Sequence, residues 1–232
     1  MLRSGIRGRR LWLVVAVAAI AVMLATGIAL AASQTIATTG EAFDHQSQPG
    51  NPPYTTDAGV VVPFQDTSGT HNVTARQTGP DGQALFRSPT ISGSGSAGVD
   101  GTQYLAPGDY QFFCTVHPTT MSGTLRVTGG TPQARPSATL KGKKTSVAKA
   151  IKKGILVNIN ASTKIDGAVV TVKLGKAMVG KATLSLAAGA QTDRVKLNKA
   201  GKSKLRHKSK AKLGVVASIP FGFPASGKVK LG

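Results

Sequence analysis

The protein has 232 residues, with 29 Lys and Arg against 9 Asp and Glu, four His and a single Cys, and 41% of its residues are hydrophobic. This length fits one large or two small domains. One Cys excludes an intramolecular disulfide framework, and four His are too few for a multi-centre copper oxidase, so the chain can hold at most one or two metal ions.

The charge is divided very unevenly along the chain. Residues 1–133 hold seven basic and seven acidic side chains. Residues 134–232 hold 22 basic side chains and only two acidic ones, Asp166 and Asp193, so the net charge of +20 lies entirely in this half. Such an asymmetry indicates two modules with different roles.

The N-terminal segment has the pattern of an export signal. Four arginines precede Leu11–Ala32, a run of 22 residues without a charge. As a helix it would reach about 33 Å, enough to span the ~30 Å hydrocarbon core of a membrane, which favours an uncleaved anchor. Ala29-Leu30-Ala31 instead matches a signal-peptidase cleavage pattern, so residues 1–32 are predicted to be a signal peptide or a signal anchor. Either way the remainder is exported to the cell envelope, anchored with its C-terminus outside or released after cleavage.

Residues 33–128 are predicted to form an all-β module, because short apolar or alternating runs recur between turn signals such as Pro80-Asp81-Gly82. The Gly- and Ser-rich stretch Ser92–Gly98 is expected to be a surface loop. Eight of the chain's 11 aromatic residues lie in this module, enough to seed a small sandwich core. The expected strands are Thr35–Thr39, Val60–Gln65, His71–Gln77, Tyr104–Leu105, Asp109–Thr115 and Gly123–Val127.

Residues 129–140 have the Gly, Pro and polar content of a linker. Residues 141–232 are predicted to form a second, small β-sandwich of immunoglobulin-like type, since runs such as Ala168–Leu174 place apolar residues on one face of a half-buried sheet. Its only aromatic residues are Phe221 and Phe223, so we expect a thin core. The expected strands are Ile155–Asn160, Ala168–Leu174, Lys181–Leu186, Thr192–Leu197 and Leu213–Ile219.

The residues best suited to chemistry gather near the end of the first module. Cys114, His117 and Met121 fall in a short segment that joins two expected strands, and His71 begins another. Each alone is more often a structural residue. Together, one thiolate, two imidazoles and one thioether are the ligand set of a type 1 copper site, which has a trigonal His₂Cys plane and a long axial Met. Zinc is the competing metal, but a zinc site would normally take a fourth Cys, His or carboxylate rather than Met.

This module resembles the cupredoxin (blue copper) family in its plastocyanin, amicyanin and pseudoazurin branch. The resemblance covers about residues 35–128 and rests on H-N-V at His71, the ligand loop C-x-x-H-P-x-x-M, the following G-T-L-x-V, and the approaches V-V-V-P-F and A-P-G-D-Y-Q-F-F-C. It implies a Greek-key β-sandwich holding one type 1 copper ion by His71, Cys114 and His117, with Met121 axial. Asn72 and Thr115 match positions beside the family's ligands, where the Asn side chain ties the two ligand loops together.

The sequence departs from the family pattern at two points. Val116 stands directly before His117, where the family often has Pro, and Pro118 follows it. The three residues between His117 and Met121 give a loop length between the family's shorter and longer versions. The axial role of Met121 is therefore the part of the ligand set that the resemblance supports least.

The resemblance implies an electron carrier and not an enzyme. Single electrons would pass between copper and redox partner proteins through His117, the ligand nearest the solvent in the family. The rival interpretation is an extracytoplasmic copper-binding protein for storage, delivery or resistance, without electron transfer.

The basic half contains a run with a cation at every second position, so that on an extended strand all of these side chains would project from one face. The run comprises Lys202, Lys204, Arg206, Lys208, Lys210 and Lys212. A second basic cluster lies within residues 141–153. The two clusters serve either as a solvated surface or as an adhesive one for an anionic membrane or cell-wall surface. Export and the scarcity of aromatic residues disfavour nucleic acid as a partner.

Overall fold

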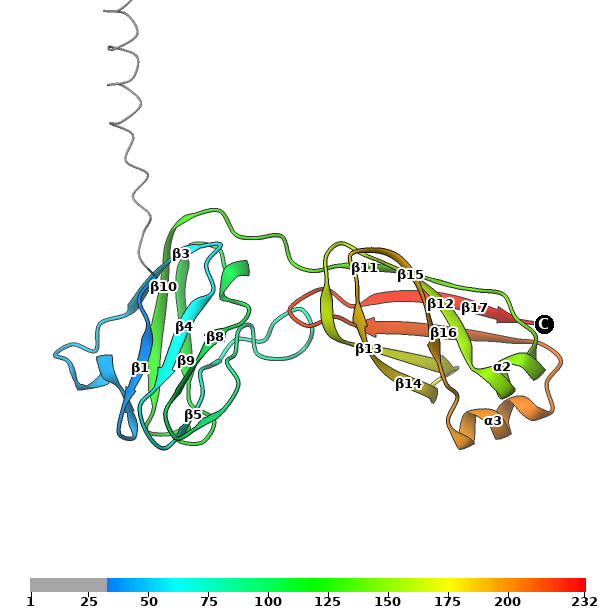
Figure 1. Ribbon diagram of the computed structural model, residues 1–232, viewed down its shortest axis with the longest axis horizontal. Coiled ribbons are helices and arrows are strands. Elements are labelled where there is room, and N and C mark those ends of the chain that lie inside the picture. The colour runs from blue at the N-terminus through cyan, green and yellow to red at the C-terminus, as the bar shows by residue number, and fades with distance from the viewer. Residues whose placement is uncertain (1–32) are drawn as a thin grey trace, which may run out of the picture. The chain divides into compact units, whose positions relative to one another are not determined.

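The computed structural model describes residues 33–232 (Figure 1). The predicted signal segment, residues 1–32, lies outside the described residues. Within residues 33–232, no helix is both long enough and apolar enough to cross a membrane. The described chain is built mainly of β-strands arranged in sandwich-like sheets, which confirms the all-β prediction.

The first part of the described chain contains two four-stranded sheets, with strand orders β2-β1-β4-β8 and β3-β10-β9-β6, and the short pair β5-β7. The pairs β1-β4 and β3-β10 are parallel, and the other pairs are antiparallel. The elements are β1 (Ile36–Thr39), β2 (Ala42–Phe43), η1 (Asp44–Ser47), β3 (Tyr54–Ala58), β4 (Val62–Asp66), β5 (Thr70–His71), β6 (Thr74–Ala75), β7 (Ile91–Ser92), β8 (Gly95–Val99), η2 (Thr102–Tyr104), β9 (Gly108–Phe113) and β10 (Ser122–Gly130), where η denotes a 3₁₀ helix.

Aromatic side chains fill the first core, which comprises buried residues between positions 36 and 127. The Phe112 ring lies 5.0 Å from the Phe43 ring in an edge-on contact and 5.8 Å from the Tyr54 ring. Gly123 sits opposite Phe112 on β10, and a Cβ atom there would come within 2.5 Å of the Phe112 ring. The sheets can therefore close over this ring only because position 123 has no side chain.

The second part of the described chain consists of the sheets β11-β12-β15 and β14-β13-β16-β17. Between them lies a core of aliphatic residues from positions 140–231. The elements are β11 (Ala138–Gly142), α2 (Val147–Lys153), β12 (Ile155–Ala161), β13 (Ile165–Leu174), β14 (Ala177–Leu186), β15 (Gly189–Val195), α3 (Lys199–Arg206), β16 (Ala211–Ser218) and β17 (Ala225–Leu231). Residues 131–137, between β10 and β11, form neither strand nor helix.

Helices α2 and α3 lie side by side at one end of this second pair of sheets (Figure 1). Each begins at a capping side chain, because Ser146 Oγ accepts a hydrogen bond from the Lys149 N–H and Asn198 Oδ1 accepts one from the Gly201 N–H. Helix α2 ends at Gly154, whose φ of 90° suits a residue without a Cβ atom. Val147 and Leu205 bury one side of each helix, while their lysines face solvent.

Three sequence predictions in the first sheets need correction. The stretch Ser92–Gly98 is not simply a surface loop, because most of it belongs to β8, which pairs with β4. Small residues suit this strand, since a Cβ atom at Gly98 would lie 2.9 Å from Val61 Cγ1. The expected strand His71–Gln77 is broken into β5 and β6. The expected strand Tyr104–Leu105 is not a strand, because Tyr104 is the last residue of η2 and Leu105 caps that helix.

The prediction that alternating cations share one face of an extended strand is also wrong. Residues 199–206 form helix α3, residues 207–210 form a turn and bend, and β16 begins only at Ala211. The six side chains of the predicted strand face are thus divided among three elements: Lys202, Lys204 and Arg206 on α3, Lys208 and Lys210 in the turn, and Lys212 on β16. The helix forms here because Asn198 caps it and Leu205 anchors it in the core.

Candidate metal centre

His71 is a buried histidine in which one ring nitrogen has a hydrogen-bond partner and the other has none among the described residues. It ends the short strand β5 and is only 1% exposed. Its Nδ1 atom lies 2.9 Å from Oδ1 of the buried Asp66. Its Nε2 atom is buried and has no hydrogen-bond partner among the described residues. A buried imidazole nitrogen without a hydrogen bond is costly, unless it serves as a ligand.

Gly69 packs against the edge of the His71 ring. Its φ is 92°, a backbone conformation that L side chains rarely adopt. A Cβ atom at this position would lie 2.7 Å from His71 Cε1, closer than van der Waals contact allows. The T-S-G-T-H segment therefore needs glycine both for its turn and for the position of the imidazole.

Cys114 and His117 come together where β9 ends. Cys114 is fully buried, its thiol is free, and its Sγ atom lies 4.0 Å from His117 Nδ1. The His117 ring centroid lies 5.1 Å from that of His71. His117 is half-buried, while its neighbours Val116 and Pro118 are exposed, so the His117 ring is the member of this group nearest the solvent.

Met121 is tied to the same turn through its backbone. Its N–H donates to the His117 carbonyl at 3.0 Å, and its carbonyl accepts from the Cys114 N–H at 3.1 Å. Its side chain is completely buried in the first core. The 114–121 segment is therefore a compact, hydrogen-bonded turn with Cys114 at one end and Met121 at the other.

Asn72 connects the two segments that contain these residues. Its side-chain oxygen accepts the Thr115 N–H at 3.0 Å, and its Nδ2 donates to Thr115 Oγ1 at 2.7 Å and to Thr90 Oγ1 at 2.9 Å. Asn72 is 5% exposed, so these hydrogen bonds are largely shielded from water. They hold the residue after His71 against the residue after Cys114.

The structure thus brings His71 near His117 and His117 near Cys114. Among residues 33–232, however, no group of three or more His, Cys, Asp or Glu side chains lies close enough together to hold a metal ion. The donor types still suit copper, since thiolate, thioether and imidazole serve both of its common oxidation states. The free Nε2 atom of His71 is the observation that most favours a ligand at this place.

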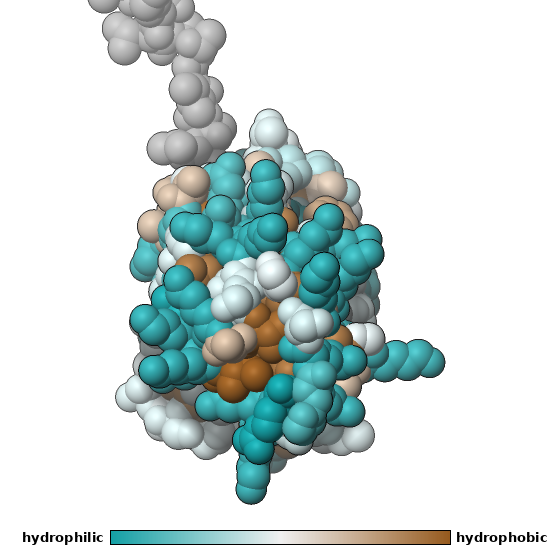
Figure 2. All heavy atoms as spheres, turned by 90° about the vertical axis from the view of Figure 1, so that its right-hand side faces the viewer, coloured by the Kyte–Doolittle hydropathy of each residue, from teal (hydrophilic) through white to brown (hydrophobic). Residues whose placement is uncertain are grey.

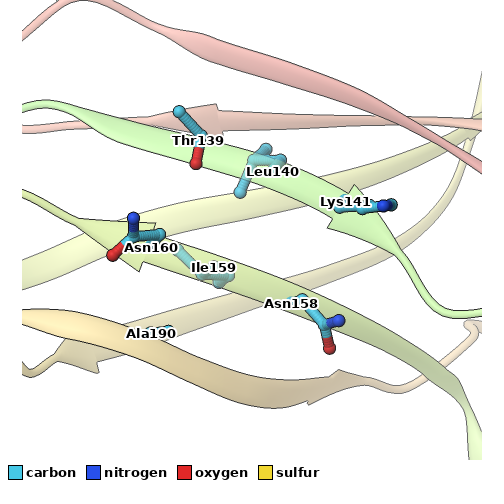
Figure 3. Close-up of a pocket in the computed structure, with 7 residues that line it drawn as sticks. All are labelled: Thr139, Leu140, Lys141, Asn158, Ile159, Asn160 and Ala190. Atoms are coloured by element: carbon cyan, nitrogen blue, oxygen red, sulfur yellow. The ribbon is translucent and has the colours of Figure 1, made fainter.

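A shallow pocket of about 370 Å³ lies elsewhere, on the sheet β11-β12-β15 (Figure 3). The exposed Thr139, Lys141, Asn158 and Asn160 line it together with Leu140, Ile159 and Ala190, and most of the surface it presents is apolar. None of the sequence-predicted ligands lines this pocket. It holds no pair of titratable groups suited to catalysis, and we assign it no role in metal chemistry.

Basic side chains gather where α2 and α3 meet. Helix α2 contributes Lys149, Lys152 and Lys153 to this group, and α3 contributes Lys199, Lys202, Lys204 and Arg206. All seven are exposed, and none forms an ion pair with another described residue. The end of the molecule that carries the two helices shows hydrophilic side chains around a smaller hydrophobic area (Figure 2). We call these seven residues the basic cap.

Comparison with known proteins leaves the family open. No family model matches the chain, and no curated protein matches it. The chain is similar in structure to the BSP domain of a biofilm-associated protein, with 13% identity over 76% of this chain and 28% of that one and a TM-score of 0.25. This chain thus spans just over a quarter of that relative's length.

Two further solved structures are similar to a comparable degree. The titin domains Z1Z2 in complex with telethonin are 12% identical over 78% of this chain and 92% of that one, with a TM-score of 0.25. Drosophila N-cadherin EC1–3 is 13% identical over 76% of this chain and 62% of that one, with a TM-score of 0.21. Scores this low assign no fold family to the chain.

Proposed function

We propose that the protein is an exported type 1 copper protein that transfers single electrons, with a cupredoxin-like first sandwich and an immunoglobulin-like second one. The single observation that carries this proposal is the buried His71 Nε2 atom, which has no hydrogen-bond partner among residues 33–232 and lies on a ring 5.1 Å from that of His117. The cupredoxin motifs around His71 and Cys114 support the choice of copper. No catalytic residue is proposed.

In this proposal the residues of the site have three roles: metal ligand, connection between the ligand segments, and contact with a redox partner. His71, Cys114, His117 and Met121 would hold the copper ion, and bound copper would supply one-electron Cu(II)/Cu(I) chemistry. Asn72 holds the two ligand segments together and so limits their movement between the two states. The exposed Val116 and Pro118 give a redox partner an apolar surface beside His117.

The alternative is a copper-binding protein for storage, delivery or resistance, and the same ligands could serve it. The two functions differ in how firmly the metal is retained. A carrier keeps its copper through many cycles of oxidation and reduction. A delivery protein favours one oxidation state and releases its ion to a chelator or partner.

The deciding experiment is the visible spectrum of Ser33–Gly232 after addition of one equivalent of Cu(II). We expect an intense blue thiolate-to-copper band that a reductant bleaches and an oxidant restores. Cys114→Ala should abolish the band, whereas His207→Gln, a change at an exposed histidine outside the site, should leave it intact. A colourless product in the wild type would refute the type 1 site, and a band that is lost with the metal on reduction would favour delivery.

A second proposal concerns the basic cap, which we propose binds an anionic lipid surface. Its cations form no ion pair with another residue of 33–232 and come from two helices, so their charge is concentrated on one end of the second sandwich. Six of the seven are lysines, which act as point charges and suit a diffuse anionic surface better than a planar, bidentate ligand. Each basic residue near such a surface contributes about 1 kcal/mol of attraction.

Sedimentation with vesicles tests this proposal. We expect Ser33–Gly232 to bind vesicles that contain phosphatidylglycerol and not those of phosphatidylcholine, and to dissociate as salt is raised. Replacing Lys202, Lys204 and Arg206 by Gln removes three charges, which at about 1 kcal/mol each should weaken binding roughly 100-fold. The ion-paired Lys164 supplies the control, since Lys164→Gln should change little. Equal binding to both vesicle types, or selective binding to an anionic cell-wall polymer, would refute the lipid proposal.

A further inference from the structure

A shallow hollow of about 330 Å³ opens where β16 begins and β17 ends. Five residues line it: Lys210, Ala211, Lys212, Lys230 and Leu231. Only residues 207–210 separate helix α3 from β16 along the chain. Helix α2 is also near, because the Gly232 N–H donates to the Thr145 carbonyl just before that helix begins. The hollow therefore lies next to both helices of the basic cap.

Two lysines of the hollow lie directly opposite each other. In the antiparallel pair β16-β17, Lys212 is the partner of Lys230, and both residues are exposed. Residues opposite each other in such a pair have Cβ atoms about 4.5–5.5 Å apart, and like charges placed there are destabilising. The exposed Lys210 adds a third cation to the hollow. Positive charge is thus concentrated at one point of this sheet.

No acidic side chain of residues 33–232 offsets this charge. None of the three lysines forms an ion pair with another described residue. The second half of the chain has only two acidic residues, of which Asp166 pairs with Lys164 and Asp193 lies on β15 in the other sheet. An anion bound between Lys212 and Lys230 would relieve their repulsion.

The surface between the lysines is apolar. Ala211 and Leu231 are direct partners in the same strand pair, with Ala211 half-buried and Leu231 only 4% exposed. Most of the surface that the hollow presents is apolar. A free phosphate would leave this surface in water, whereas a ligand that joins a phosphate to hydrocarbon would cover it. The combination of charge and apolar surface therefore favours a lipid over a soluble anion.

We propose that the hollow binds an anionic lipid with a phosphomonoester headgroup, its phosphate between Lys212 and Lys230 and its adjoining hydrocarbon over Ala211 and Leu231. This inference rests on the proposed lipid binding of the basic cap. A phosphomonoester carries about −1.5 to −2 charges at pH 7 and three acceptor oxygens, so it can pair with two lysines at once. The basic cap then supplies attraction to anionic membranes in general, and the hollow supplies a preference among headgroups.

The first test compares two kinds of vesicle with matched total surface charge, one containing phosphatidic acid and the other phosphatidylglycerol. We expect Ser33–Gly232 to bind the phosphatidic acid vesicles about 10-fold more tightly. Lys212→Gln/Lys230→Gln should weaken that binding roughly 30-fold, the loss expected for two basic residues near an anionic surface, and should abolish the preference. Lys141→Gln/Lys181→Gln removes the same charge from exposed lysines outside the hollow and the basic cap, and should keep the preference.

The outcomes separate this inference from the proposal on which it rests. If the wild type binds both kinds of anionic vesicle equally, or if Lys212→Gln/Lys230→Gln keeps the preference, this inference fails alone. If the wild type binds neither kind, the lipid proposal for the basic cap fails, and this inference with it.

The second test locates the ligand by NMR. A short-chain phosphatidic acid, added below its micelle-forming concentration, should shift the backbone amide signals of Ala211 and Leu231. Glycerol 3-phosphate has the same phosphate without the acyl chains and should shift them only at much higher concentration. Equal affinity for the two compounds would overturn the assignment to a lipid, and shifts confined to α2 and α3 would overturn the assignment to the hollow.

Discussion

The two sandwiches differ most in what they bury. The described residues include six buried polar or charged side chains, and all six lie in the first sandwich: Thr38, Thr56, Asp66, His71, Asn72 and Thr102. The second core contains only aliphatic side chains. The two sandwiches also differ in charge. Residues 33–133 hold three basic and seven acidic residues, whereas residues 134–232 hold 22 basic and two acidic residues.

These differences suggest different roles: the first sandwich has the buried polar groups that a metal site needs, and the second has a charged surface that could bind a partner. Buried polar groups cost free energy unless they are hydrogen-bonded, and a core without them is easier to stabilise. In the first sandwich, such buried polar side chains include the proposed ligand His71 and its neighbours Asp66 and Asn72. The second has a simple core and places its distinctive residues, the lysines, on its surface.

The largest expected effect comes from opening the aromatic core. Phe112→Ala should destabilise the first sandwich by about 3–5 kcal/mol, because it leaves a cavity beside Phe43 and Tyr54. All three tyrosines belong to this sandwich, so tyrosine fluorescence during denaturation reports on it selectively. The neighbouring Phe113, which is half-exposed, supplies the control, since Phe113→Ala should cost clearly less. Equal losses for the two variants would contradict the proposed packing.

In the second sandwich, the corresponding test is Leu205→Ala. Leu205 is fully buried and anchors α3, so its truncation should cost about 2–5 kcal/mol and loosen the basic cap. Far-UV circular dichroism during thermal unfolding measures the change, and tyrosine fluorescence should keep its wild-type transition. Lys204→Ala, on the exposed side of the same helix, should stay within about 0.5 kcal/mol of wild type. A shift of the tyrosine transition in Leu205→Ala would mean that the two cores do not unfold independently.

A smaller effect is expected from removing the Asn72 side chain, whose hydrogen bonds connect the two segments that carry the proposed ligands. Asn72→Ala removes the hydrogen bonds to Thr115 and Thr90, and the groups left unpaired should cost about 1–3 kcal/mol. Urea denaturation followed by tyrosine fluorescence measures it. The exposed Asn160 gives the matched change in the second sandwich, where Asn160→Ala should be nearly neutral. An unchanged midpoint in Asn72→Ala would show that these hydrogen bonds add no net stability.

The smallest effect concerns one exposed ion pair in each sandwich. Hydrogen bonds from Arg126 lower the pKa of Asp109, and hydrogen bonds from Lys164 and then Ser185 lower that of Asp166. Because each folded pKa lies below the unfolded one, the stabilisation is present above the unfolded pKa and is lost as pH falls through the folded value. Arg126→Gln and Lys164→Gln should each return one carboxylate toward its ordinary value of 3.8. Side-chain NMR titration measures this, and an unmoved pKa would contradict the pairing.

Periodicity in the sequence was enough to predict most of the long strands, since β4, β9, β10, β12, β13 and β16 each overlap an expected run. Periodicity did not predict strands made of small side chains, and it wrongly predicted a strand where a helix-capping side chain starts a helix. Gly95–Val99 has few apolar side chains, so nothing in its sequence marks it as a strand, although its backbone pairs fully with β4. The lysines after Asn198 alternate as in a strand, yet the capping side chain makes that segment a helix.

The sequence also named the residues of the candidate site but missed Asp66. His71, Cys114, His117 and Met121 stand out through their chemistry and their order along the chain. The signal for Asp66 was available in V-P-F-Q-D, where alternation places a carboxylate on the same face as Val62 and Phe64. Its contact with His71 depends on the turn through Gly69, which no strand pattern predicts.

The parallel pairing of β3 with β10 has a consequence for how the protein is made. It joins Tyr54 to the region of Leu125, and all four proposed ligands, from His71 to Met121, lie inside the loop that this pairing closes. Closing so long a loop costs entropy before its contacts form, which slows folding. Under the proposed export, a chain that emerges from a channel with its N-terminus first cannot complete this sandwich until β10 has passed through. If the proposed copper site exists, its loading should follow translocation of that strand and not accompany it.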